Sequence, residues 1–349
     1  MKKKALVSSF VLGIIVIAVI FLVLKPEEML EQIKRIDPKY LLVALALQIL
    51  SLIIVSARWH WFINSKENRV SRKNIFLITL AGQSMNSVTP GSRWGGEPVK
   101  AYLLHKKEGI PAVSAMASIV VEKIADIIAF SLIATGAIIY GLLFLNVPQN
   151  IMILLILALF FTLSVLFALF YVSFFKRIRS ETIIRLMERY KWITDKIPVL
   201  AQYKHKVESN LNNYYITILK ISSKKHAWPV GVLLSLAYWG TEIGRTYVIF
   251  MALGVDVPLA VIATAHVISS LIGSFPLLPG DLGIVEGTMI LIYSSISIVQ
   301  ETGLAVGGVV TIIDRFFSYW LVIIIGLPLT WYLGLTSMKG EKNEENGTS

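Results

Sequence analysis

The chain has 349 residues, of which 55% are apolar and 16% charged, and its mean hydropathy is +0.70. This composition excludes a soluble globular enzyme and leaves no room for a large soluble catalytic domain. The formal net charge is +11, with 33 Lys and Arg against 22 Asp and Glu. In a membrane protein such an excess of basic residues indicates which loops are cytoplasmic, and it is not evidence for nucleic-acid binding. The chain has no cysteine, which excludes disulfides, thiolate catalysis and cysteine-ligated metals.

Apolar stretches long enough to cross a bilayer begin at the N-terminus, where residues 5–24 follow three lysines. A hydrocarbon core of about 30 Å requires about 20 helical residues. The further apolar stretches cover residues 40–63, 74–104, 111–145, 151–175, 227–253, 258–299 and 303–335. We therefore expect an all-α, polytopic integral membrane protein located in the cell membrane.

Two of these stretches are broken near their middle. Residues 74–104 are too few for two full crossings, yet Pro90-Gly91 interrupts them. Residues 258–299 are interrupted in the same way at Pro279-Gly280. Each stretch is interpreted as a re-entrant pair of half-helices, which enters the membrane and returns to the face it came from.

Basic residues indicate the orientation of the chain. Segment 176–226 carries twelve Lys and Arg against four acidic residues and is expected to be cytoplasmic. Both termini are then cytoplasmic, and the two re-entrant pairs enter from opposite faces. The expected domains are a first transmembrane half at 1–175, a basic cytoplasmic connector at 176–226, a second transmembrane half at 227–337 and a polar cytoplasmic tail at 338–349.

Charged residues recur in the same order in the two halves. Glu97 follows Pro90 by seven residues, and Glu286 follows Pro279 by seven. An arginine precedes each turn and an acid-base pair follows it: Arg58 and Glu122-Lys123 in the first half, Arg245 and Asp314-Arg315 in the second. An inverted repeat of this kind around broken helices is typical of secondary transporters, whose substrate site lies near the midplane between the repeats.

The broken helices also suggest a binding chemistry. A helix that begins within the membrane presents unpaired N–H groups and the positive end of its dipole, which favour an anion. Two such ends would face one another, so a phosphate or carboxylate could be held between them. The alternative is that the glycines pack helices closely and that Asp281 and the two glutamates belong to ordinary helix starts. The candidate substrate-binding residues are Arg93, Gly95, Gly96, Glu97, Lys100, Gly280, Asp281, Gly283 and Glu286.

Ionisable residues inside apolar stretches form a second set of candidates, because each costs about 3 kcal/mol at the membrane centre unless it is paired. Neighbours such as Glu122 and Lys123 point about 100° apart on a helix, so each is expected to find its partner on another helix. Glu242 and Arg245 can pair on one helix face, where a purely structural ion pair is the alternative to a functional one. The expected charge network comprises Glu122, Lys123, Asp126, Glu242, Arg245, Asp314 and Arg315.

Four segments carry a resemblance to a known family: 86–100, 121–126, 279–286 and 314–315. They resemble the flippase-like transmembrane domain of lysylphosphatidylglycerol synthases and the related free-standing bacterial and archaeal membrane proteins, over nearly the whole chain. The resemblance implies movement of a lipid across the bilayer, and similar modules are joined to glycosyltransferases that work on polyprenyl-phosphate carriers. The synthases attach their amino acid with a separate soluble domain, which this chain lacks. Asp281 stands where the second turn of the family usually has glycine.

Together these observations predict a flippase-like translocator of an anionic or lipid-linked head group. Two alternatives stay open: an intramembrane lipid-modifying transferase and an ion-coupled carrier of a small anion. The sequence has no Asp-x-Asp metal pair, His-Glu-x-x-His or nucleophile motif, so an enzyme is disfavoured and neither a metal nor a cofactor is expected. The expected partner is a membrane lipid, either an anionic phospholipid or a polyprenyl-phosphate-linked substrate, and not nucleic acid. A homodimer and a separate lipid-modifying enzyme are further partners that the sequence leaves open.

Overall fold

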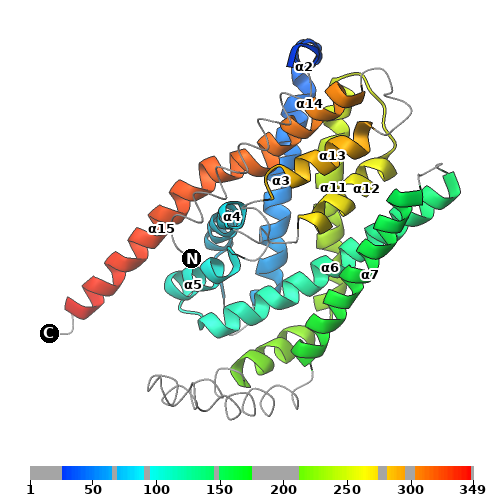
Figure 1. Cartoon of the computed structure of the whole chain (residues 1–349). Coiled ribbons are helices and arrows are strands. Elements are labelled where there is room, and N and C mark those ends of the chain that lie inside the picture. Colours follow the sequence, from blue (N-terminus) through cyan, green and yellow to red (C-terminus); the bar gives the residue numbers. More distant parts are fainter. Residues whose placement is uncertain are drawn as a thin grey trace, which may run out of the picture.

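The computed structural model of the chain describes residues 26–64, 69–89, 95–144, 149–174, 212–273, 281–294 and 303–346. The regular secondary structure of these residues is helical, which confirms the all-α class (Figure 1). The helices of the first half are α2 (Pro26–Lys34), α3 (Pro38–Ile63), α4 (Arg72–Val88), α5 (Glu97–Glu108), α6 (Ala112–Phe144) and α7 (Gln149–Phe174). Those of the second half are α11 (Ala227–Ala252), α12 (Leu259–Ile272), α13 (Ile284–Ser294), α14 (Gly303–Arg315), the π-helical turn η2 (Phe316–Trp320) and α15 (Leu321–Asn346).

Local capping signals set several helix ends. Asp37 caps α3, because its side chain accepts from the N–H of Lys39 at 3.0 Å and Pro38 occupies the first helical position. Ser71 caps α4 through a bond of 3.5 Å to an N–H of the first turn. α5 ends at Gly109, whose φ of +69° is the left-handed conformation that glycine adopts after a helix.

Helices α3 and α11 lie side by side at the centre of the molecule (Figure 1). Hydrogen bonds join residues 37 and 252, 48 and 245, 51 and 242, 58 and 235, and 62 and 224. The residue numbers rise on α3 as they fall on α11. The two helices are therefore antiparallel along their whole length.

Helices α4 and α5 form an antiparallel hairpin beside α3. At its open end the Asn74 amide donates to Glu108 at 2.6 Å, and near its closed end the N–H of Gly96 donates to Asn86 at 2.6 Å. A Cβ on Gly96 would lie only 1.9 Å from the backbone oxygen of α4 it faces, so the close approach requires glycine. The 17 residues of α4 and the 12 of α5 span about 25 and 18 Å at 1.5 Å per residue. Neither helix is long enough to cross a hydrocarbon core of about 30 Å.

Helices α12 and α13 form a second hairpin at the far end of α11. α12 starts shortly after α11 ends, and the ring of Tyr293 at the end of α13 lies 5.0 Å from that of Phe250 near the end of α11. The chain enters and leaves this hairpin at the end of α11, whereas it enters and leaves the α4–α5 hairpin at the end of α3. Because α3 and α11 are antiparallel, the two hairpins open toward opposite ends of the molecule. The breaks expected within 74–104 and 258–299 are thus present as helix ends.

The outer surface of the described helices is apolar. The side chains of Phe160 on α7 and Trp331 on α15 are 71% and 70% exposed, while Arg245 in the interior is 0% exposed. Such a reversal of the usual distribution fits a chain surrounded by lipid. By length and apolarity alone, two of the described helical segments could cross a membrane, Pro38–Ile63 and Gly303–Gly334.

Candidate functional site

A first buried charge network is centred on Arg58 of α3. Its guanidinium donates to Glu122 at 3.0 Å and to Asp126 at 2.7 Å, both on α6. It also donates to the hydroxyl of Ser235 on α11 at 2.9 Å. The side chains of Arg58 and Glu122 are 3% and 1% exposed. Such a pair is stable only if each charge is satisfied by several partners, as it is here.

Glu97, the first residue of α5, extends this network to two lysines. Lys100 Nζ lies 3.0 Å from one of its carboxylate oxygens and Lys123 Nζ lies 2.8 Å from the other. Lys100 also reaches Glu122 at 3.2 Å and lies 4.5 Å from the centre of the Trp59 ring, a favourable cation–π contact. Glu97 is therefore both a first-turn carboxylate of α5 and the ion-pair partner of two lysines, the buried Lys100 and the 18% exposed Lys123.

A second network is centred on Arg245 of α11. Its Nε donates to Asp314 of α14 at 2.9 Å, and its two terminal nitrogens donate to Glu242 at 2.8 and 3.0 Å. The expected pairing of Glu242 and Arg245 on one helix face is thereby confirmed. Gln48 of α3 accepts from Arg245 at 2.5 Å, and Thr246 donates to Asp314 at 2.9 Å. The buried charges are again bonded to groups from three helices.

Arg315 and Glu286 form the outer part of the second network. Arg315 Nε donates to Glu286 Oε1 at 2.5 Å, and the other carboxylate oxygen accepts from the N–H of Gly283 at 2.7 Å. The guanidinium lies 4.5 Å from the centre of the Tyr319 ring. The Tyr319 hydroxyl donates to the carbonyl of Ser87 at the end of α4, at 2.8 Å. This last bond joins the second network to the first hairpin.

The two networks pair equivalent residues in the same way. The arginine before each turn binds the acid of the later acid-base pair, and the base of that pair binds the glutamate after the turn. The equivalent contacts are Arg58–Glu122 and Arg245–Asp314, and Lys123–Glu97 and Arg315–Glu286. The expectation that each neighbour finds its partner on another helix is therefore confirmed.

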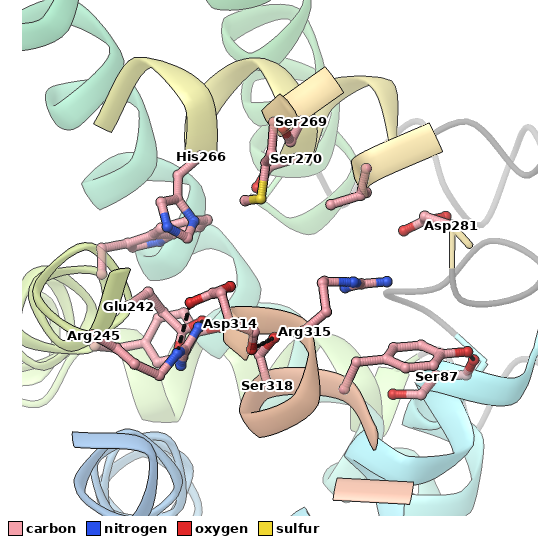
Figure 2. A pocket seen from close by; sticks show the side chains of 15 residues that line it. Ser87, Glu242, Arg245, His266, Ser269, Ser270, Asp281, Asp314, Arg315 and Ser318 are labelled. Atoms are coloured by element: carbon pink, nitrogen blue, oxygen red, sulfur yellow. Dashed lines mark hydrogen bonds and ion pairs between the residues drawn. The ribbon is translucent and has the colours of Figure 1, made fainter. Parts of the chain in front are cut away.

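Each network faces a polar cavity of about 160 Å³. Glu97, Lys100, Glu122, Lys123 and Asp126 line the first, and Glu242, Arg245, Asp281, Asp314 and Arg315 line the second. Figure 2 shows the second cavity, with Arg245, Glu242 and Asp314 gathered on one side and Arg315 pointing toward the side of Asp281. Ser87 and Tyr238 line both cavities, so these two residues mark the boundary between them.

Asp281 has an unusual backbone conformation. Its φ of +58° is the only positive value among non-glycine residues that the structure describes. The left-handed region costs most residues about 1–2 kcal/mol, and Asp is among the few that tolerate it. This geometry explains why the corresponding turn of the resembled family usually has glycine, and it aims a 7% exposed aspartate at the second cavity.

The remaining candidate substrate-binding residues differ in whether they line a cavity. Glu286 does not line the second cavity but holds Arg315, which does. Gly95 and Gly96 are closely packed against Thr89 and the backbone of α4, in keeping with the alternative interpretation of these glycines. The turn residues Arg93 and Gly280 lie outside the described residues.

Sequence reasoning did not select several polar residues that bond to charged side chains of the two networks. Gln48, Ser51 and Arg58 follow one another on α3 at intervals of three and seven residues, which places them on one helix face. Such a polar stripe within an apolar helix is the signal that would have found them. On α11 the same spacing of seven residues separates Ser235 from Glu242.

Short hairpins, buried charge networks and an apolar exterior define an α-helical membrane protein with polar cavities in its interior. The chain belongs to the family of the lysylphosphatidylglycerol synthase TM region, whose family model matches residues 10–326. It is 30% identical over 339 residues to a UPF0104 membrane protein of Methanothermobacter thermautotrophicus, which covers 96% of this chain and 97% of that protein.

Two further relatives extend the comparison. A UPF0104 membrane protein of Methanocaldococcus jannaschii is 28% identical over 347 residues, 98% of this chain and 96% of that protein. The glycosyltransferase AglD of Haloferax volcanii is 19% identical over 309 residues, which are 82% of this chain and 48% of that protein. No solved structure matches the chain. The resemblance seen in the sequence, to the transmembrane domain family of the lysylphosphatidylglycerol synthases, is confirmed.

Proposed function

We propose that the protein is a flippase-like translocator, which moves the head group of an anionic or lipid-linked membrane lipid across the bilayer. The observation that carries this proposal is the pair of adjoining polar cavities, each faced by buried charges inside an apolar exterior. A charged head group cannot cross hydrocarbon unaided, because leaving water without compensating partners is too costly. Polar cavities that adjoin within the molecule offer it such partners along the way.

The proposal includes an inverted repeat with two re-entrant hairpins, in a protein of the cell membrane whose termini are both cytoplasmic. Three observations support the repeat: the equivalent ion pairs, the antiparallel α3 and α11, and the hairpins that open toward opposite ends. A fourth observation is a reciprocal pair of hydrogen bonds between α3 and α11. Arg58 bonds to Ser235, which lies ten residues before Arg245. Arg245 in turn bonds to Gln48, which lies ten residues before Arg58. Reciprocal contacts of this kind are what a two-fold relation between halves produces.

In the proposed cycle the head group replaces protein carboxylates as the ion-pair partner of the cations that line the cavities. In the first cavity a phosphate oxygen competes with Glu97 for Lys100 and Lys123, forming charge-assisted hydrogen bonds. It then passes Ser87 and Tyr238 at the boundary. In the second cavity Arg315 and Arg245 are the available cations. Glutamates released from a cation balance charge or carry protons, and the two hairpins move relative to each other to open each cavity in turn.

Transbilayer movement of a fluorescent anionic phospholipid in proteoliposomes tests this function. We expect the Glu97→Gln and Glu286→Gln double variant to lower the rate at least about tenfold, since about 1.4 kcal/mol of lost stabilisation is a factor of ten. The control is Ser164→Ala, because Ser164 is an exposed residue of α7 whose hydroxyl donates to the backbone carbonyl of Phe160 in the same helix, at 2.8 Å. An unchanged rate in the double variant, with normal insertion, would contradict the proposal.

The relation to AglD favours a second candidate function, in which the protein itself transfers a group to a lipid. The similarity spans 48% of a protein that is named a glycosyltransferase. We propose that translocation, and not group transfer, is the activity of this chain, and that any transfer is performed by a separate enzyme. Mass spectrometry of lipids incubated with the purified protein and a sugar donor distinguishes the two. A new glycolipid product would establish the transferase and overturn our assignment.

A further inference from the structure

A third cavity, of about 190 Å³, lies between α6, α7, α11 and α12 and differs in character from the other two. Most of its wall is apolar and is formed by Ile127, Phe130, Phe161, Val165 and Leu271. An apolar cavity of about 150 Å³ is enough to bind benzene. The third cavity is therefore large enough for a segment of hydrocarbon chain.

The inner end of this cavity meets both polar cavities. Lys123 and Asp126 line it together with the first polar cavity, and Trp239 and Ser270 line it together with the second. Three of the four polar residues in the cavity wall, Lys123, Asp126 and Ser270, are among these shared residues, and the fourth is Thr162. A molecule with an apolar tail in the third cavity can thus place a polar head beside either charge network.

The outer end of the cavity faces the lipid side of the molecule. Phe161 lines the cavity and is also 42% exposed on the outer surface. α7 lies at the edge of the molecule beside α6 (Figure 1), and its further outward residues, such as Leu163 and Phe167, are apolar and 46% and 70% exposed. Phe161 therefore connects the wall of the cavity with the apolar outer surface of α7.

We infer that the third cavity binds one hydrocarbon chain of the lipid whose head group occupies the polar cavities, and that the lipid enters sideways between α7 and α12. The inference rests on the proposed function in that the cargo is a lipid. It adds the tail site and the route of access. A carrier of a small soluble anion would have no use for an apolar passage from the bilayer to both charge networks.

The inference is tested with a phospholipid that carries a photoactivatable diazirine within its acyl chain, reconstituted with the protein in vesicles. After illumination, mass spectrometry of peptides maps the labelled residues. We expect labelling of Trp239, which is 3% exposed and lines the cavity, to exceed that of Trp59, which is 0% exposed and does not line it, by at least about fivefold. Equal labelling of the two tryptophans would overturn the inference.

A matched pair of substitutions on α7 gives a second measurement. Val165→Phe narrows the cavity and is expected to lower Trp239 labelling at least about threefold, with Val165→Leu giving a smaller decrease. Leu163→Phe, two residues away on the exposed face, is expected to leave it unchanged. Equal labelling in Val165→Phe and Leu163→Phe would contradict a chain in the cavity. Labelling of Trp239 without transbilayer movement of lipid would support the tail site and refute translocation. Transbilayer movement without labelling of Trp239 would refute the tail site alone.

Discussion

Substitutions in the ion pair of Arg315 and Glu286 can show whether the second network stabilises the protein or handles the substrate. The two side chains are 14% and 7% exposed, and their atoms approach to 2.5 Å. At an effective dielectric constant of 20, unit charges at this distance attract by about 6–7 kcal/mol. Desolvation offsets much of this attraction, so removing one partner of a buried pair costs about 3–5 kcal/mol. Because Arg315 keeps its contact with Tyr319, we expect Glu286→Gln to lower the free energy of unfolding by about 3 kcal/mol.

The double variant Glu286→Gln and Arg315→Gln provides the decisive comparison. It removes both charges, so we expect the free energy of unfolding to recover to within about 1 kcal/mol of the wild type. Unfolding is measured by denaturant titration in mixed micelles, and lipid movement is measured on the same preparations. Recovered stability without recovered movement assigns Arg315 to the substrate, whereas recovery of both assigns the pair to structure. A double variant as unstable as Glu286→Gln alone would refute the electrostatic reasoning.

Three further substitutions test the backbone and helix contacts, each read as a change in the free energy of unfolding. Asp281→Val should cost at least about 1–2 kcal/mol more than Asp281→Gly, because both remove the carboxylate but only valine is strained by the positive φ at this position; equal losses would contradict the strain. Gly96→Ala should cost about 2–3 kcal/mol, since its Cβ would meet backbone at 1.9 Å, whereas Gly244→Ala, with its nearest atom at 3.9 Å, is the control. Lys224→Met should cost about 1–2 kcal/mol, because it removes bonds of 3.1 and 2.8 Å to the last carbonyls of α3, and the exposed Lys225→Met should change little.

Much of the architecture could be predicted from the sequence because its determinants are local. The length of an apolar stretch and a helix-breaking Pro-Gly pair can both be recognised from neighbouring residues alone. The structure accordingly has two separate helices within 74–104 and two within 258–299, as predicted. The recurrence of Arg58 and Arg245 around the two turns was visible for the same reason. The rule that adjacent residues on a helix diverge by about 100° also predicted that Glu122 and Lys123 would have different partners.

The identity of those partners depended on tertiary structure. That Lys123 binds Glu97 while Glu122 binds Arg58 follows from how α3, α5 and α6 meet, and residue spacing carries no such information. Gln48 and Ser51 on α3 were missed because a single glutamine or serine in an apolar helix indicates no function by itself. Their role is visible only once Arg245 and Glu242 of α11 are seen to bond to them. Arg93 and Gly280, on which the predicted anion site partly depended, lie outside the described residues.

The sequence by itself determined that the chain is helical, apolar outside, broken at two turns and similar to one family of membrane proteins. These properties follow from composition, periodicity and short motifs, which act over a few residues. Only the tertiary structure decided that the charges form two separate networks, that each faces its own cavity, and that Ser87 and Tyr238 lie between them. It also revealed the apolar cavity beside α7, whose wall comes from four helices. A cavity exists only where distant segments fail to fill the space between them, so no local pattern in the sequence encodes it.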